Sequence, residues 1–335
     1  MDQMFQERAV PKNLSHLVEL IPSRRTYHKR GKLIRSLSSV GILPTHNQQV
    51  SVNGQLNAGI RFLQGQTHVK DGVLYMCHTS CDLEEAGKLT DYLGTIKTWM
   101  DKNQGQVVTV LLTNGDRVDV NMFKNDFETS GMASYAYAPP KKLAMNEWPT
   151  LQTLINDGKR AVIFLGIFIP FYIQFNQKLI SPDYLADSNK APYILDEFSY
   201  YFETAFDVTE FTDCALNRPP GSDGNGLMML GTFRIFYIFG ALLTITVNHF
   251  KDIELLPDIL IPDVVNTPKT NAATGEDSIG EHSDWCVSEW GGRGPNMVLV
   301  DNFNIGKLPF RQLYWNCTDL KLGNVFQAER TLNHL

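Results

Sequence analysis

The feature that most constrains this chain is an alternation of short apolar runs with stretches of helical spacing, from residue 50 onward. The apolar runs are 60–66, 73–77, 107–113, 160–165 and 296–301. Helical spacing occurs at 88–101, 121–130, 149–157 and 192–204. Strands that alternate with helices favour repeated β–α units around a parallel sheet. We therefore predict an α/β fold, with a TIM-like (β/α) barrel favoured and a doubly wound sheet as the alternative.

Composition limits the class of protein. The chain has 335 residues, of which 43% are hydrophobic and 20% are charged, and this excludes a disordered or fibrous protein. The net charge is -6, and the basic residues are spread out except for a cluster within 1–41, so no nucleic-acid partner is expected. We predict that 1–41 is an atypical basic arm. We expect no signal peptide in it, because its first ten residues include Asp2, Glu7 and Arg8 and no apolar run.

Polar side chains gather near the ends of the first two predicted strands. The first strand carries Arg61, Gln64 and Gln66, and the second leads into His78. In barrel enzymes the loops and strand ends at one face build the active site. We therefore expect Arg61, Gln64 and Gln66 to bind substrate and His78 to be catalytic, while His68 is expected on the loop between the strands.

Cysteine spacing suggests an oxidising compartment. The five cysteines are Cys77, Cys81, Cys214, Cys286 and Cys317. A zinc site of Cys77, His78 and Cys81 is one interpretation, but no second Cys/His pair lies nearby in the sequence. A short-loop disulfide between Cys77 and Cys81 is favoured, with Cys214–Cys286 as the natural second pair.

Seven stretches carry a resemblance to a known family: QLNAGIRFLQGQTH (55–68), CHTSCDLEEAGKLTDYLGTIKTWMD (77–101), VVTVLLTNGD (107–116), WPTLQTLINDGKRAVIFL (148–165), DYLADSNKAPYILDEFSYYFET (183–204), CALNRPPG (214–221) and PNMVLVDNFN (295–304). In order, spacing and content they resemble the secreted fungal branch of the phosphatidylinositol-phospholipase-C-like phosphodiesterases, whose fold is a TIM barrel. The resemblance covers most of residues 50–335. It implies an extracellular or cell-surface protein.

The resemblance implies a mechanism with two histidines and a cation. One histidine acts as general base and the other protonates the leaving alkoxide, while arginine or calcium stabilises the phosphoryl oxygens. The second histidine matches His78. Gln64 and Gln66 stand where calcium-dependent relatives carry carboxylates, and neutral amides supply little of what calcium requires. No metal or other cofactor is therefore expected.

The first histidine of the family has no clear match in this chain. The family pattern reads roughly Gly-Ala-His-Asp-Ser, whereas this chain matches only a later loop, Leu-Pro-Thr-His-Asn-Gln at 43–48. His46 is the candidate base, although its register favours a loop. Asp116 and Asp301 each follow a strand and are candidates for the head-group site, with a turn and an ion pair as the respective alternatives. Asp301 could also orient a histidine.

The implied function is metal-independent cleavage of a phosphodiester, with the head group of an inositol lipid as partner. The loss of one of two cooperating acid–base groups would impair it by about 10²–10⁴ in rate. The alternatives are a non-catalytic binding protein on the same barrel and a protein anchored in the membrane through 227–247, a stretch long enough to span a bilayer.

Three segments interrupt the resemblance within the barrel expected over 42–335. They are 166–182, 231–246 and 307–322. When they are removed, the flanking residues join into family-like sequence. We hypothesise that they are retained introns, and genuine loop insertions are the alternative.

Overall fold

A seven-stranded sheet forms the centre of the fold. The computed structural model describes residues 17–18, 47–167, 189–218 and 245–305, apart from 79, 83, 145–146, 206–207, 212–213, 257–258 and 292–294. Its strands are β1 (Leu17–Val18), β2 (Phe62–Lys70), β3 (Val73–His78), β4 (Glu84–Lys88), β5 (Val108–Asn114), β6 (Ala161–Ile167) and β7 (Ile194–Asp196). The order is β4-β3-β2-β5-β6-β7, with β1 also paired to β2. The β1, β5, β6 and β7 strands run parallel to β2, while β3 and β4 extend the sheet in antiparallel fashion.

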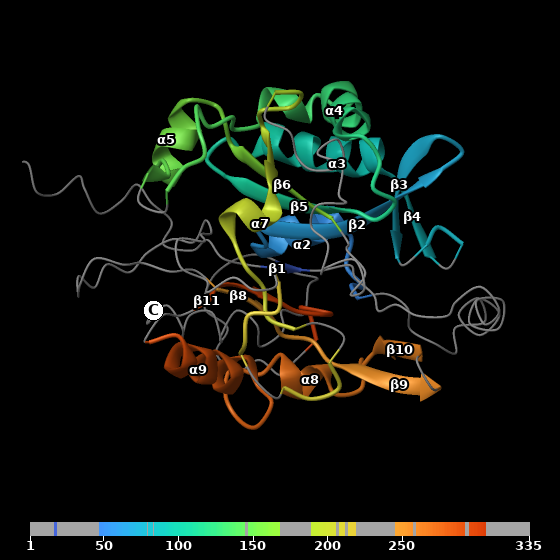
Figure 1. Cartoon of the computed structure of the whole chain (residues 1–335), viewed down its shortest axis with the longest axis vertical. Helices are drawn as coiled ribbons and strands as arrows, with labels where there is room; N and C mark the ends of the chain where they lie inside the picture. Colours follow the sequence, from blue (N-terminus) through green and yellow to red (C-terminus); the bar gives the residue numbers. More distant parts are fainter. Residues whose placement is uncertain are drawn as a thin grey trace, which may run out of the picture.

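Two helices, α3 (Leu89–Lys102) and α4 (Val120–Thr129), cover one face of this sheet (Figure 1). The helices of the first half of the chain are α2 (Val52–Ala58), α3 (Leu89–Lys102), α4 (Val120–Thr129), the 3-10 turn η1 (Met132–Ser134) and α5 (Leu151–Asn156). The predicted helical spacing of α3 is confirmed, because its apolar positions are buried. They pack in a first core cluster with alternate residues of the strands, such as Leu63, Val110 and Ile163.

A second group of elements lies on the other side of the sheet (Figure 1). It consists of β8 (Ile245–Asn248), β9 (Asp252–Leu256), β10 (Ile259–Pro262), α8 (Thr267–Thr270), α9 (Ile279–Glu289) and β11 (Pro295–Leu299). The β8 and β11 strands are parallel partners, and β9 and β10 form an antiparallel pair. A second core cluster joins Phe62, Leu111 and Phe164 of the main sheet to Met297 and Leu299 of β11.

The predicted α/β class is confirmed. The β1 strand pairs with β2 and also contacts β11, so the main sheet approaches the β8–β11 pair as the wall of a barrel would. Through the described residues the barrel stays open, because β11 and β8 form a separate sheet. Two residues of the expected N-terminal arm, Leu17 and Val18, thus belong to the fold.

The helix predicted over 192–204 is wrong in its first part. Its residues form β7, followed only by the short helix α7 (Glu197–Tyr200). Ile194 packs in the first core cluster and Leu195 in the second, so this segment is buried on both faces of the sheet. Pairing with β6 therefore overrides the helical spacing, which is a weak local preference.

The interrupting segments fall largely outside the described residues. Gly166 and Ile167, which begin the first segment, are the last residues of β6. Ile245 and Thr246, which end the second segment, are the first residues of β8. The segment 307–322 and most of 227–247 are not described. Among the described residues, no helix has the length and apolar character that crossing a bilayer would need.

Candidate active site at the carboxyl ends of the parallel strands

Strand register brings a row of polar positions together at the carboxyl ends of three strands. Gln66 of β2 is aligned with Thr113 of β5, and Thr113 is aligned with Gly166 of β6. Aligned residues of neighbouring strands point to the same face, and that face alternates along each strand. Leu111 and Phe164, two residues earlier, belong to the second core cluster. The polar row therefore lies on the interior face, directly above an apolar layer.

Gln64 and Gln66, both predicted as substrate ligands, share this interior face. They are buried, with 3% and 4% of their surface exposed. The side-chain oxygen of Gln64 has no hydrogen-bond partner among the described residues. Burying an amide without satisfying it is costly, so the Gln64 side chain is poorly explained by packing alone.

Glu197 completes the row at its β7 end, although it was not among the residues selected from the sequence. Leu165 of β6 is aligned with Asp196 of β7, and Glu197 follows as the first residue of α7. A Cβ atom at Gly166 would lie 1.6 Å from Glu197 Oε2, so the carboxyl group occupies the space above that glycine. Burial, followed by the charge of Glu203, raises the pKa of Glu197 well above its usual value.

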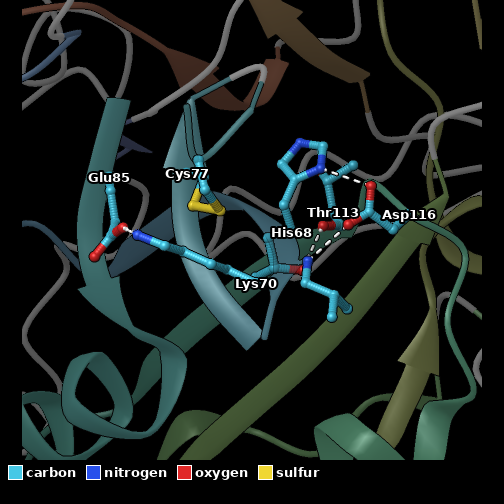
Figure 2. Close-up of a disulfide and its surroundings, with 9 residues drawn as sticks. His68, Lys70, Cys77, Glu85, Thr113 and Asp116 are labelled. Carbon is cyan, nitrogen blue, oxygen red and sulfur yellow. Dashed lines mark hydrogen bonds and ion pairs between the residues drawn. A yellow bond between two sulfur atoms is a disulfide. The ribbon is translucent and has the colours of Figure 1, made fainter. Parts of the chain in front are cut away.

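His68 and Asp116 form a dyad at the end of β2. The Nδ1 atom of His68 lies 2.9 Å from Asp116 Oδ1, and Asp116 Oδ2 accepts a 2.6 Å hydrogen bond from the backbone N–H of Val69. Figure 2 shows the imidazole beside the carboxylate, next to the strand that carries Cys77. His68 is 9% exposed, and its Nε2 has no hydrogen-bond partner within the described chain.

The predicted loop position of His68 is wrong, because β2 continues to Lys70. The hairpin partner β3 extends the strand, with His68 paired to Tyr75. The absence of a side chain at Gly115 leaves room for the imidazole of His68. A Cβ atom there would lie 2.5 Å from His68 Cε1 and 2.8 Å from the backbone oxygen of Thr67. The motif Asn-Gly-Asp at 114–116 was interpreted as a head-group or turn motif. It forms a turn in which Asp116 also contacts the imidazole of His68.

His78 lies on β3, beside the predicted disulfide. The structure joins Cys77 to Cys81, so these sulfurs are not available to zinc. The Nδ1 atom of His78 is 3.3 Å from Glu84 Oε2, and both side chains are buried. Alternation along β3 assigns His78 to the face of Met76, which packs in the first core cluster. That face is opposite to the one that carries the polar row.

Arg61 does not belong to this site. It precedes β2 and so lies at the amino end of the strand. Its guanidinium donates to the backbone oxygens of Leu56 and Ile60 and to Gln106 Oε1, and it stacks on Trp99 at 4.6 Å. Because the main chain takes up these donors, the substrate-binding role predicted for Arg61 is corrected to a structural one.

Asp301 lies after β11 and has an amide as its partner. Its Oδ1 accepts a 2.8 Å hydrogen bond from Asn47 Nδ2, while Oδ2 has no partner in the described part of the chain. Burial raises the pKa of Asp301 well above its usual value. Among the described residues, no histidine is paired with Asp301. His46, the other predicted catalytic residue, lies outside the described residues.

Two further histidines, His249 after β8 and His282 in α9, are buried and in contact with each other. His249 Nε2 donates to the backbone oxygen of Thr270 at 2.7 Å, and the Nδ1 atoms of His249 and His282 are 2.9 Å apart. Burial and the neighbouring His282 lower the pKa of His249 to about 3, so it is neutral at physiological pH. These contacts make His249 a core residue.

The second predicted disulfide, Cys214–Cys286, is present. Of the described residues, one cluster of His, Cys, Asp or Glu has the spacing to hold a metal, and it consists of Cys214, His282 and Cys286. Its sulfurs are joined to each other, which removes the thiolates that a metal would require.

These features define an α/β protein with a neutral polar row and an oriented imidazole at the carboxyl ends of its parallel strands. Comparison with known families supplies the more particular assignment. The family described as PI-PLC X 1 matches residues 35–316, and the chain belongs to this PI-PLC X-domain family. The resemblance seen in the sequence is thus confirmed.

Two fungal relatives agree with this assignment, and the chain also has a low similarity to a solved structure. The chain is 42% identical over 300 residues to the "PI-PLC X domain-containing protein 1" of Arthroderma benhamiae, covering 88% of this chain and 81% of the relative. It is 35% identical over 297 residues to an "Uncharacterized secreted protein" of the same fungus, covering 86% of this chain and 57% of the relative. A phosphatidylinositol-specific phospholipase C from Staphylococcus aureus matches at 12% identity with a TM-score of 0.40, covering 94% of this chain and 91% of that one.

Proposed function

We propose that this protein cleaves phosphodiesters of phosphatidylinositol-type lipids and that His68 is its general base. The His68–Asp116 dyad carries the proposal. A carboxylate only accepts hydrogen bonds, so His68 donates from Nδ1 and keeps the lone pair on Nε2. An imidazole held in this tautomer can take a proton from an attacking hydroxyl near neutral pH. Membership in the PI-PLC X-domain family supports the phosphodiester as the bond that breaks.

The amides of Gln64 and Gln66 are proposed to hold the phosphoryl oxygens. They share the interior face with His68, and an amide N–H is a neutral hydrogen-bond donor. Donors fixed in a buried place stabilise charge that develops on phosphoryl oxygens without reorganising. The proposed chemistry therefore uses no metal. Asp116, predicted to bind the head group, is proposed instead as the residue that orients His68.

The proton for the leaving alkoxide is the second requirement of the reaction. The phosphorus–oxygen bond to the leaving group breaks as this oxygen gains a proton. Sequence resemblance assigns this step to His78, which has Glu84 beside its Nδ1. Because alternation along β3 places His78 on the face of Met76, we assign the base role to His68 alone and keep the acid role of His78 as the point to test.

We further propose that the protein acts outside the cell. The relative that is called a secreted protein supports this location, and so do the two disulfides, which persist in oxidising compartments.

The test is hydrolysis of phosphatidylinositol in mixed phosphatidylcholine vesicles by the purified chain, compared with its His68→Gln and His78→Gln variants. We expect His68→Gln to lower kcat by about 10²–10⁴, the usual contribution of a general base. Gly115→Ala should also lower kcat, because the added methyl group would displace the imidazole of His68. If His78→Gln abolishes activity and His68→Gln leaves it unchanged, the dyad is structural.

A second outcome would remove the enzymatic proposal itself. If the wild-type chain releases no inositol phosphate while it still binds the vesicles, the non-catalytic binding protein becomes the better account. Vesicles without phosphatidylinositol are the control for that binding.

A further inference from the structure

One member of the polar row has no part in the proton transfers. In register at the carboxyl ends stand Gln66, Thr113 and Gly166, and Glu197 fills the space above the glycine. The layer beneath this row is apolar on the same strands, with Leu111 and Phe164. On this face of the sheet, the side chains of β5 and β6 therefore change from an apolar layer to the polar row within two residues along each strand.

The charge on this part of the row is set by three buried groups. Glu197 shares a hydrogen bond with Glu203, and Arg218 pairs with Glu203 through an ion pair and through backbone bonds. One guanidinium offsets the charge of one carboxylate, and two carboxylates this close cannot both ionise in a buried place. We therefore assign the charge to Glu203 and the shared proton to Glu197, which leaves Glu197 neutral.

The other oxygen of Glu197 has no partner. The residue is 3% exposed, and its Oε1 is buried without a hydrogen bond in the described part of the chain. Buried polar atoms are nearly always satisfied, so a native structure that leaves one open requires an explanation. The carboxyl group lies over Gly166, next to Thr113, and therefore at the row that the proposed substrate would reach.

We infer that Glu197 is a specificity-determining residue, whose Oε1 accepts a hydrogen bond from a hydroxyl of the polyol part of the substrate. The inference rests on the proposed function for its substrate. A neutral carboxyl and the hydroxyl of Thr113 match hydroxyl groups, which both donate and accept, better than they match a phosphate, which only accepts. The row thus divides into a phosphate side at β2 and a polyol side at β6 and β7.

Direct binding of free myo-inositol tests this inference without any hydrolysis. We would measure the Kd by ligand-observed NMR for the wild type and for the Glu197→Met and Gly166→Ala variants. Glu197→Met keeps the length of the side chain and removes its hydrogen bonds. Gly166→Ala leaves Glu197 in place in the sequence and displaces its carboxyl group. Both should raise the Kd about tenfold, the loss expected for one good hydrogen bond.

Thr109→Val is the matched control. Thr109 is buried on the same strand and the same face as Thr113, four residues nearer the amino end, so its variant should bind myo-inositol within about twofold of the wild type. Circular dichroism establishes that each variant folds. If Glu197→Met does not fold, Gly166→Ala supplies the result.

Three outcomes overturn the inference. They are a wild type that does not bind myo-inositol, variants that bind it as well as the wild type does, and variants that weaken binding of inorganic phosphate as much as that of myo-inositol. Loss of hydrolysis with intact, Glu197-dependent binding would instead remove the proposed function and leave the role of Glu197 in polyol binding.

Discussion

The two ends of the parallel sheet treat buried polar groups in opposite ways. At the amino end, Arg61 and Arg160 have their guanidinium groups bound by backbone oxygens. At the carboxyl end, polar atoms of Gln64, His68 and Glu197 are buried and have no partner within the described chain. A satisfied buried group stabilises the fold, whereas an unsatisfied one lowers stability and offers a place for a ligand.

This difference shows how one sheet can separate stability from function. Parallel strands carry their active sites at the carboxyl ends in barrel enzymes, and the amino ends serve stability. Arg160 illustrates the second role: it bonds the backbone oxygens of Met100, Asn103 and Gln106 and stacks over Tyr135 at 4.6 Å. It ties the end of α3 to the start of β6.

Removing a disulfide should have the largest effect on the free energy of unfolding. It is therefore the first test of the contrast between the two ends of the sheet. Cys214–Cys286 spans 72 residues and packs with Phe202 in a third core cluster, whereas Cys77–Cys81 spans 4 residues at the end of β3. By loop closure, removing the first as Cys214→Ser with Cys286→Ser should lower the free energy of unfolding by about 4 kcal/mol, and removing the second by about 2 kcal/mol.

Urea denaturation of both double variants measures these losses, and hydrolysis assays at a temperature where both are folded compare activity. We expect activity to fall more in the Cys77→Ser, Cys81→Ser variant, because that bridge fixes the end of the hairpin strand next to His68. An activity loss that simply follows the stability loss would contradict the separation of the two ends.

The second prediction concerns the amino end. Arg160→Met keeps the length of the side chain but removes the guanidinium hydrogen bonds to three backbone oxygens, and should lower the free energy of unfolding by about 3 kcal/mol. Urea denaturation is the measurement. The matched change at the other end, Gln64→Met, should alter this free energy by less than about 1 kcal/mol, because Gln64 Oε1 has no partner to lose. Equal losses would refute the comparison.

The smallest expected effect is the contribution of Glu197, at the carboxyl end, to the pH dependence of stability. The pKa of Glu197 in the folded protein is raised above its ordinary value of 4.5, so the folded state keeps a proton that the unfolded state releases as pH rises. Stability should therefore decrease above about pH 4.5, by up to about 1 kcal/mol per pH unit for this group. Glu197→Gln should remove that share of the slope.

Urea denaturation of the wild type and of Glu197→Gln at several pH values from 4 to 7 measures this pH dependence of the free energy of unfolding. The two proteins should have the same pH slope near pH 4 and diverge above it, with the variant favoured at pH 7. If the wild type and Glu197→Gln keep parallel curves up to pH 7, Glu197 is ionised in the fold, and the proton shared with Glu203 is misassigned.

Much of the fold could be predicted from local pattern. The strands β2, β3, β5 and β6 and the helix α3 lie close to their predicted places, since buried apolar runs and helical spacing report directly on burial. The strand β7 could not be predicted, because Ile194 and Leu195 read as part of a helix until pairing with β6 is known.

The candidate site was predicted only in part. Gln64 and Gln66 lie on the predicted first strand, and both disulfides were paired correctly. His68 was missed because the length of β2 depends on its hairpin partner. The signal that could have found it was the Asn-Gly-Asp motif at 114–116, whose parallel neighbour is the end of β2.

The sequence by itself determined the α/β class, the family and the residue types at the strand ends, because these follow from periodicity and from motifs that are local in the chain. Only the tertiary structure decided which of those residues meet. It set His68 against Asp116 and placed Glu197 above Gly166. Such choices depend on strand register, where a shift of one residue reverses every side chain, and register is set by contacts far apart in the sequence.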